Sequence, residues 1–165
     1  MTEIKLNLEN LTEDERKQLT ELVEKANKAE SKAWKPKDYE PFWAISRHGT
    51  ISQIRFLTEN CDEADYAIGN CFKTKEEAEF AIERFKIRAE LQRYADEHNE
   101  PIDWCNDRQR KHGIHCDYTA KKLYVYFHTT CREPFQIYFS SQEIAEAAIK
   151  AVGEERIKKY LFGVE

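Results

Sequence analysis

One uninterrupted helical pattern, from Lys75 to about Asp96, constrains the fold of this chain more than any other stretch. It opens with Thr74 and Glu77 at the spacing of a capping box, which satisfies backbone N–H groups at a helix start. The helix would be about 33 Å long at 1.5 Å per residue. Its apolar residues form two stripes: Ala78, Ala81, Ile82, Phe85 and Ala89 in one, and Phe80, Ile87, Leu91 and Tyr94 in the other. We therefore expect this helix to contact more than one layer of the fold.

A shortened copy of this helix start recurs near the C-terminus. Residues 71–83 (CFKTKEEAEFAIE) match residues 138–150 (YFSSQEIAEAAIK) at six of thirteen positions, and Ser141 takes the place of the capping Thr74. Each copy follows a set of runs that are typical of strands. The sequence therefore predicts a β-meander-plus-helix unit that is used twice.

The first unit should begin with a β-hairpin. Residues 42–47 and 50–57 have strand composition, and Gly49 at the second position of the turn between them favours a tight hairpin. Residues 60–65 predict an acidic loop. Residues 66–72 predict a third short strand that leads into the long helix.

Three short strands are expected in the second unit as well. They are predicted at residues 115–118, 123–129 and 134–139, with turns at 119–121 and 130–133. A helix capped by Ser141 then follows, and Gly153 interrupts it before a final short helical segment.

Residues 11–30 predict an amphipathic N-terminal helix that opens with another capping box, formed by Thr12 and Glu15. Its narrow apolar stripe would pack either on the chain's own sheet or on the same helix of a second copy in a homodimer. The stripe consists of Leu19, Leu22, Val23, Ala26, Ala29 and Ala33. An extended linker with two prolines should follow it.

We therefore expect an α+β fold: an N-terminal amphipathic helix followed by two β-meander-plus-helix units packed around a long central helix. The predicted parts are an N-terminal helix at 1–33, a first unit at 34–97, a connecting segment at 98–112 and a second unit at 113–165.

Length and composition predict a soluble, cytoplasmic protein. A chain of 165 residues can bury a hydrophobic core, and no apolar run approaches the roughly 20 residues of a membrane span. The start, MTEIKLNLEN, lacks the basic and apolar regions of a signal peptide. Five cysteines without a CxxC pair favour reduced thiols. A net charge of -5 argues against broad coating of nucleic acid but allows a local basic patch.

Four side chains of metal-ligand type, Cys105, His112, His115 and Cys116, lie within twelve residues. Their spacing fits no standard zinc finger, and neighbouring strand residues point to opposite faces, which leaves at most three usable ligands. We expect ordinary histidines and a buried thiol, with no metal and no cofactor. Catalysis is not expected either, because the five glycines are too scattered for a phosphate-binding loop, although a Cys–His pair stays open.

A basic segment beside an aromatic residue gives one candidate binding site. Trp104 is followed by Arg108, Arg110 and Lys111, and arginine beside an aromatic ring is typical of base stacking and phosphate contact. Acidic residues are interleaved in this segment, so a solvated charged surface is the alternative. The segment 104–112 predicts nucleic-acid or nucleotide binding as the alternative function of the chain.

An aromatic hairpin gives another candidate. Tyr124, Tyr126 and His128 should share one face of a strand, and Tyr138 should alternate with Phe139 on a later strand. This face would either pack against the first unit or the N-terminal helix, or serve as an exposed contact surface for a protein partner.

Several motifs resemble small uncharacterised accessory proteins of bacteriophages and prophages of Gram-positive bacteria. The likeness lies in Trp34-x-Pro36, the strand 42–45 with Gly49, the run GNCFKTKEEAEFAIER (69–84) and the closing GEERIKKYLFGV (153–164). These motifs are structural, and they transfer no catalytic residue. The resemblance implies a non-enzymatic protein that binds a host protein in the bacterial cytoplasm, such as a component of an antiviral defence system.

Overall fold

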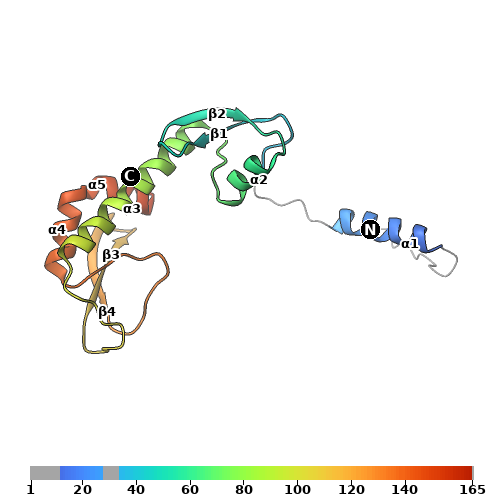
Figure 1. The fold of residues 1–165 in the computed structure, drawn as a ribbon. Helices are drawn as coiled ribbons and strands as arrows, with labels where there is room; N and C mark the ends of the chain where they lie inside the picture. Colours follow the sequence, from blue (N-terminus) through green and yellow to red (C-terminus); the bar gives the residue numbers. More distant parts are fainter. Residues whose placement is uncertain (1–11, 28–33, 165) are drawn as a thin grey trace. The chain divides into compact units, whose positions relative to one another are not determined.

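The computed structural model describes residues 12–27 and 34–164, and it contains both helices and antiparallel strands, as expected for an α+β fold (Figure 1). The chain divides into two compact units, residues 1–35 and residues 36–165. The first unit contains helix α1 (Glu13–Asn27). Its capping box is confirmed, because the Thr12 N–H donates to the Glu15 carboxylate over 2.9 Å. Ala29 and Ala33 of the predicted stripe lie outside the described residues.

The larger of the two compact units, residues 36–165, begins with the hairpin predicted for residues 42–57. Strands β1 (Pro41–Ile45) and β2 (Ile51–Arg55) pair antiparallel, and both are shorter than expected. Gly49 in the turn has a φ of 76°, a conformation that suits glycine. Phe42 and Phe56 are buried beside this hairpin, with their rings edge to face at 5.9 Å.

The prediction for residues 60–72 was wrong, because a helix, α2 (Asn60–Ala67), replaces the acidic loop and the first two residues of the third strand, and a turn follows it. Asp62 explains the difference: its carboxylate is buried and accepts the Leu57 N–H over 2.7 Å, just before the helix. Acidic residues in a first helical turn are also favoured by the helix dipole. Only Phe72 pairs with the sheet, through a single antiparallel bridge to Trp43.

The long helix is confirmed as α3 (Lys75–His98). Thr74 caps it by accepting the Glu77 N–H, and the Glu77 carboxylate accepts the Lys73 N–H. It packs near β1 and β2 and, through Ile87, Leu91 and Ala95, on α4 (Gln142–Val152). It also packs on η1 (Lys158–Phe162), a short π-helical segment whose Tyr160 ring lies 5.1 Å from the Phe80 ring. The expectation that this helix contacts more than one layer is therefore confirmed.

A second sheet follows, with the strand order β4-β3-β5. Strand β3 (Lys111–Asp117) begins four residues earlier than predicted, β4 (Lys122–His128) agrees with its prediction, and β5 (Tyr138–Phe139) has two residues. Because β5 pairs with β3 and not with β4, this sheet is not a meander, and that part of the prediction was wrong.

The two halves of the compact unit 36–165 share one order of elements. In each half, a phenylalanine after the hairpin pairs with the first strand of that hairpin: Phe72 with Trp43, and Phe139 with His112. A helix then starts three residues after each phenylalanine, capped by Thr74 in one half and by Ser141 in the other. This correspondence agrees with the repeat that the sequence predicts.

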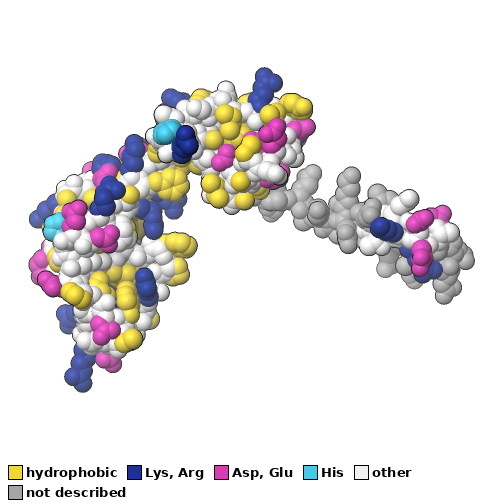
Figure 2. Space-filling model, viewed as in Figure 1, with side chains coloured by type: hydrophobic (Ala, Val, Ile, Leu, Met, Phe, Trp, Pro, Cys, Tyr) yellow, Lys and Arg dark blue, Asp and Glu magenta, His cyan; other side chains and the backbone are white. Residues whose placement is uncertain are grey.

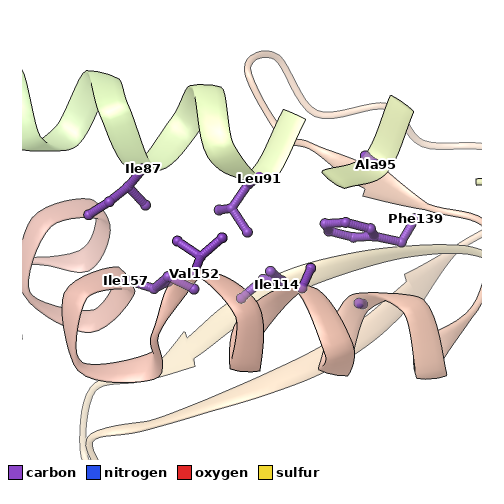
Figure 3. Packing of buried hydrophobic residues seen from close by; sticks show 9 residues of the cluster. Ile87, Leu91, Ala95, Ile114, Phe139, Val152 and Ile157 are labelled. Carbon is purple, nitrogen blue, oxygen red and sulfur yellow. The ribbon is translucent and has the colours of Figure 1, made fainter. Parts of the chain in front are cut away.

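The main hydrophobic core lies between the second sheet and the helices α3, α4 and α5 (Glu154–Ile157) (Figure 3). Its buried residues are Ile87, Leu91, Ala95, Ile114, Phe139, Ala145, Ala148, Val152 and Ile157. Asn99, which follows α3, fixes the end of this helix beside β5: its side chain donates to the Tyr138 carbonyl and accepts the Ser140 N–H, both over 2.9 Å.

Candidate functional site

The two faces of the second sheet have different surroundings. Side chains alternate along β3 and β4, so Ile114, Val125 and their neighbours point toward α3 and α4. The opposite face carries His115 from β3 and Tyr124, Tyr126 and His128 from β4, and we call these four residues the tyrosine–histidine face. Tyr124 is 47% exposed and Tyr126 is 53% exposed. Two of the three tyrosines that the sequence singled out therefore remain open to solvent.

Aromatic contacts hold the tyrosine–histidine face in order. The His115 ring stacks on Tyr124 with centroids 5.6 Å apart, and the His128 ring meets Tyr126 edge to face at 5.5 Å. The two imidazoles also approach each other, with 3.4 Å between their Nε2 atoms. Rings that are already ordered lose little conformational entropy when a partner binds, which favours a contact surface.

Burial lowers the pKa of His115, and the neighbouring His128 acts in the same direction, whereas Glu133 acts against them. His115 is therefore neutral at pH 7. A neutral imidazole beside Tyr124 and Tyr126 offers one donor and one acceptor, so His115 adds polarity to the face without adding a charge.

Tyr138 is placed differently from the other predicted contact residues. It is only 7% exposed, its hydroxyl accepts the Glu133 N–H over 2.8 Å, and its ring meets Trp104 edge to face at 4.9 Å. The His128 ring contacts the Tyr138 ring edge to face, with centroids 5.9 Å apart. Tyr138 thus borders the tyrosine–histidine face from β5, and a partner cannot reach most of its ring.

Lys111, predicted as a nucleic-acid contact, has its side chain inside the protein. It is fully buried, and its ammonium donates to the Asn106 carbonyl over 2.6 Å and to the Thr129 carbonyl over 2.8 Å. The ammonium also lies 5.6 Å from the Trp104 ring centre. These contacts join the loop before β3 to the end of β4, so this charge is not free to hold a phosphate.

The other basic residues of the predicted segment do not gather around Trp104. Arg108 is exposed in a turn, and Arg110 lies over Phe127 with its guanidinium carbon 4.5 Å from the ring centre. Arg132, from the loop after β4, lies over Trp104 at 5.2 Å instead. Sequence reasoning missed Arg132 because the fold, not the spacing, brings it to this ring.

The four metal-ligand candidates are spread over different surroundings. His112 and Cys116 alternate with His115 along β3, so they point to the opposite face of the sheet, and Cys105 is exposed in the preceding loop. Burial lowers the pKa of His112. Within residues 12–27 and 34–164, no group of three or more His, Cys, Asp or Glu side chains could hold a metal ion.

Sequence reasoning also missed an apolar groove of about 820 Å³ along α3. Phe80, Phe85 and Arg84 line it from the helix, and Phe135 lines it from the loop before β5. Phe85 is 60% exposed and Phe135 is 84% exposed. The offset apolar stripe of the helix was the available signal, but nothing in the spacing showed that these rings stay uncovered.

Comparison with known proteins found no match among protein-family models, curated proteins or solved structures. None of the helices in the described part of the chain is long and apolar enough to cross a membrane.

Proposed function

We propose that this chain is a non-enzymatic binding protein that engages a protein partner through the tyrosine–histidine face. One observation carries the proposal: Tyr124 and Tyr126 stay about half exposed on one face of a sheet whose other face is buried. Tyrosine supplies a large contact area, a hydroxyl for hydrogen bonding and few rotatable bonds, and it is enriched at the energetic centres of protein interfaces.

The finer form of the proposal comes from the sequence resemblance to accessory proteins of phages and prophages. Such proteins act in the bacterial cytoplasm on host proteins, so we propose a host protein as the partner, and a component of an antiviral defence system as the class to test first. An anti-CRISPR-like inhibitor fits this description, because blocking a host complex requires a binding surface and no catalytic group.

An affinity capture with matched variants tests the proposal. The tagged wild-type chain, a Tyr124→Ser/Tyr126→Ser variant and a Tyr39→Ser control are incubated with lysate of a Gram-positive host. Tyr39 is a suitable control because it is 66% exposed and lies outside the second sheet. We expect one host protein to be retained by the wild type and the control and lost from the double variant. Titration of the purified partner should show binding about thirtyfold weaker in the double variant, the size of an interface hot spot.

Two results would count against this function. Equal retention by the double variant would show that the tyrosines do not form the interface. Absence of a protein partner together with tight binding of RNA or DNA would replace the proposal with its alternative.

The alternative is nucleic-acid or nucleotide binding, and the position of Arg132 over Trp104 favours it. Aromatic residues on a sheet face with a guanidinium nearby can stack on bases and contact phosphates. A gel shift at increasing salt would detect such binding. The complex should weaken in Arg108→Ala/Arg110→Ala and in Arg132→Ala, and an unchanged shift would remove those residues from the interface.

A further inference from the structure

The apolar groove along α3 is built from residues that share one helix face. Phe80, Arg84 and Arg88 are spaced four residues apart, so they follow one another along α3, and Phe85 lies beside Arg84. Phe72 and Phe135 complete the lining from other segments of the same unit. Figure 2 shows hydrophobic side chains next to dark blue basic side chains beside the middle of α3.

Phe135 is held in a conformation that folding alone does not explain. Its φ of 65° is unfavourable for a residue with a Cβ atom, and its side chain is 84% exposed, so burial gives no compensation. The Arg88 guanidinium donates to the Phe135 carbonyl over 2.9 Å and thereby fixes the loop beside the helix. The result is a phenyl ring that is presented to solvent at the side of an apolar groove.

The charges around the groove are divided between its two ends. Glu76 and Glu77 lie at the start of α3, and the Glu77 carboxylate already accepts the Lys73 N–H. Arg84 and Arg88 lie about two to three turns further along. Arg84 is exposed and, within the described part of the chain, has no carboxylate partner. A ligand that follows the phenylalanines therefore meets a free positive charge beside them.

We propose that this groove binds a short acidic segment of a protein partner, with large apolar side chains that pack among the phenylalanines and a carboxylate that pairs with Arg84. Apolar walls with an unpaired arginine at the side match such a segment in both hydrophobicity and charge. The groove shares no residue with the tyrosine–histidine face, so this inference stands independently of the proposed function.

Selection of displayed random dodecapeptides on the full-length chain, followed by fluorescence anisotropy with the enriched peptides, tests the inference. We expect the enriched peptides to combine at least two large apolar residues with Asp or Glu. Phe85→Ser and Arg84→Glu should each weaken binding about tenfold or more, and Tyr124→Ser should leave it unchanged. Replacing the acidic residues of the peptide by their amides should remove most of the effect of Arg84→Glu, because that effect depends on the charge pair.

Phe135→Gly separates binding from folding. Glycine adopts a positive φ without strain, so this variant should be at least as stable as the wild type in thermal unfolding, while its peptide affinity falls about thirtyfold. A purely structural Phe135 would give the reverse, a less stable chain with normal peptide affinity.

Three results would overturn the inference. They are a selection that enriches no peptide, enriched peptides without acidic residues, and equal binding by the Phe85, Arg84 and Phe135 variants. Light scattering completes the test: a concentration-dependent dimer of the wild type that Phe135→Gly abolishes would show that a second copy of this chain occupies the groove instead.

Discussion

The two faces of the second sheet have different surroundings. On the inner face, Ile114 is 6% exposed and Phe139 is fully buried, in contact with α3 and α4. On the outer face, Tyr124 and Tyr126 are about half exposed. The Tyr124 ring contacts His115, and the Tyr126 ring contacts His128, both on the same face. Strand alternation here separates residues that stabilise the fold from residues whose rings stay open to solvent.

The largest expected change in the free energy of unfolding comes from Phe139→Ala on the inner face. Phe139 is fully buried on the inner face, so its removal leaves a cavity in the main core and should lower the free energy of unfolding by about 3–5 kcal/mol. Urea denaturation monitored by circular dichroism measures the change. Tyr126→Ala on the outer face is the matched control, and an equal loss in both variants would break the distinction between the faces.

Lys111→Met tests a residue that is buried although it lies on the outer side of the sheet. Methionine keeps most of the apolar stem but removes the ammonium that donates to the Asn106 and Thr129 carbonyls, so unfolding should cost about 1–3 kcal/mol less. Lys122→Met, at an exposed position of β4, should change the free energy by less than about 0.5 kcal/mol. Equal values from the two denaturation curves would mean that water replaces the lost donor.

Much of this arrangement could be predicted from local patterns. The capping residues Thr12, Thr74 and Ser141 mark helix starts correctly, because capping depends on residues within one turn. The alternation of Tyr124 and Tyr126 with apolar neighbours likewise indicates a strand with two unlike faces.

The errors concern hydrogen bonds and strand pairings between separate elements, which local composition does not reveal. The helix α2 depends on a buried Asp62 that accepts the Leu57 N–H, which composition alone presents as an acidic loop. The pairing of β5 with β3 depends on how the 129–137 loop returns to the sheet. Lys111 reads as a surface charge in the sequence, and its two carbonyl partners lie 5 and 18 residues away. Each of these features is set by tertiary contacts.

The pH dependence of stability reports on His115, which lies on the outer face of the sheet. Burial lowers the pKa of His115 in the folded protein below the 6.5 of an exposed histidine, so the unfolded chain binds a proton first as the pH falls. The free energy of unfolding should therefore decrease as the pH is lowered from about 7.5 to about 5.5. Below the folded-state pKa, both states carry the proton and this contribution becomes constant.

His115→Gln isolates that contribution. Denaturation curves between these pH values should show a smaller slope in the variant, while the part of the slope that comes from the half-buried His112, whose pKa is also lowered, remains. Glu143 does not interfere, because its pKa is lowered from 4.5 and it titrates at more acidic pH. An identical slope in wild type and variant would show that His115 does not differ between the folded and unfolded states.

The smallest expected effect on stability comes from the outer tyrosines themselves. Tyr124→Ser and Tyr126→Ser each remove ring contacts at a half-exposed position, so each should cost about 1 kcal/mol or less in urea denaturation. A loss near that of Phe139→Ala would show that the outer face is a second core, and that the exposed rings exist for packing. A small loss combined with lost partner binding is the outcome that assigns stability to one face and recognition to the other, because the same substitution is then silent in folding and severe in binding.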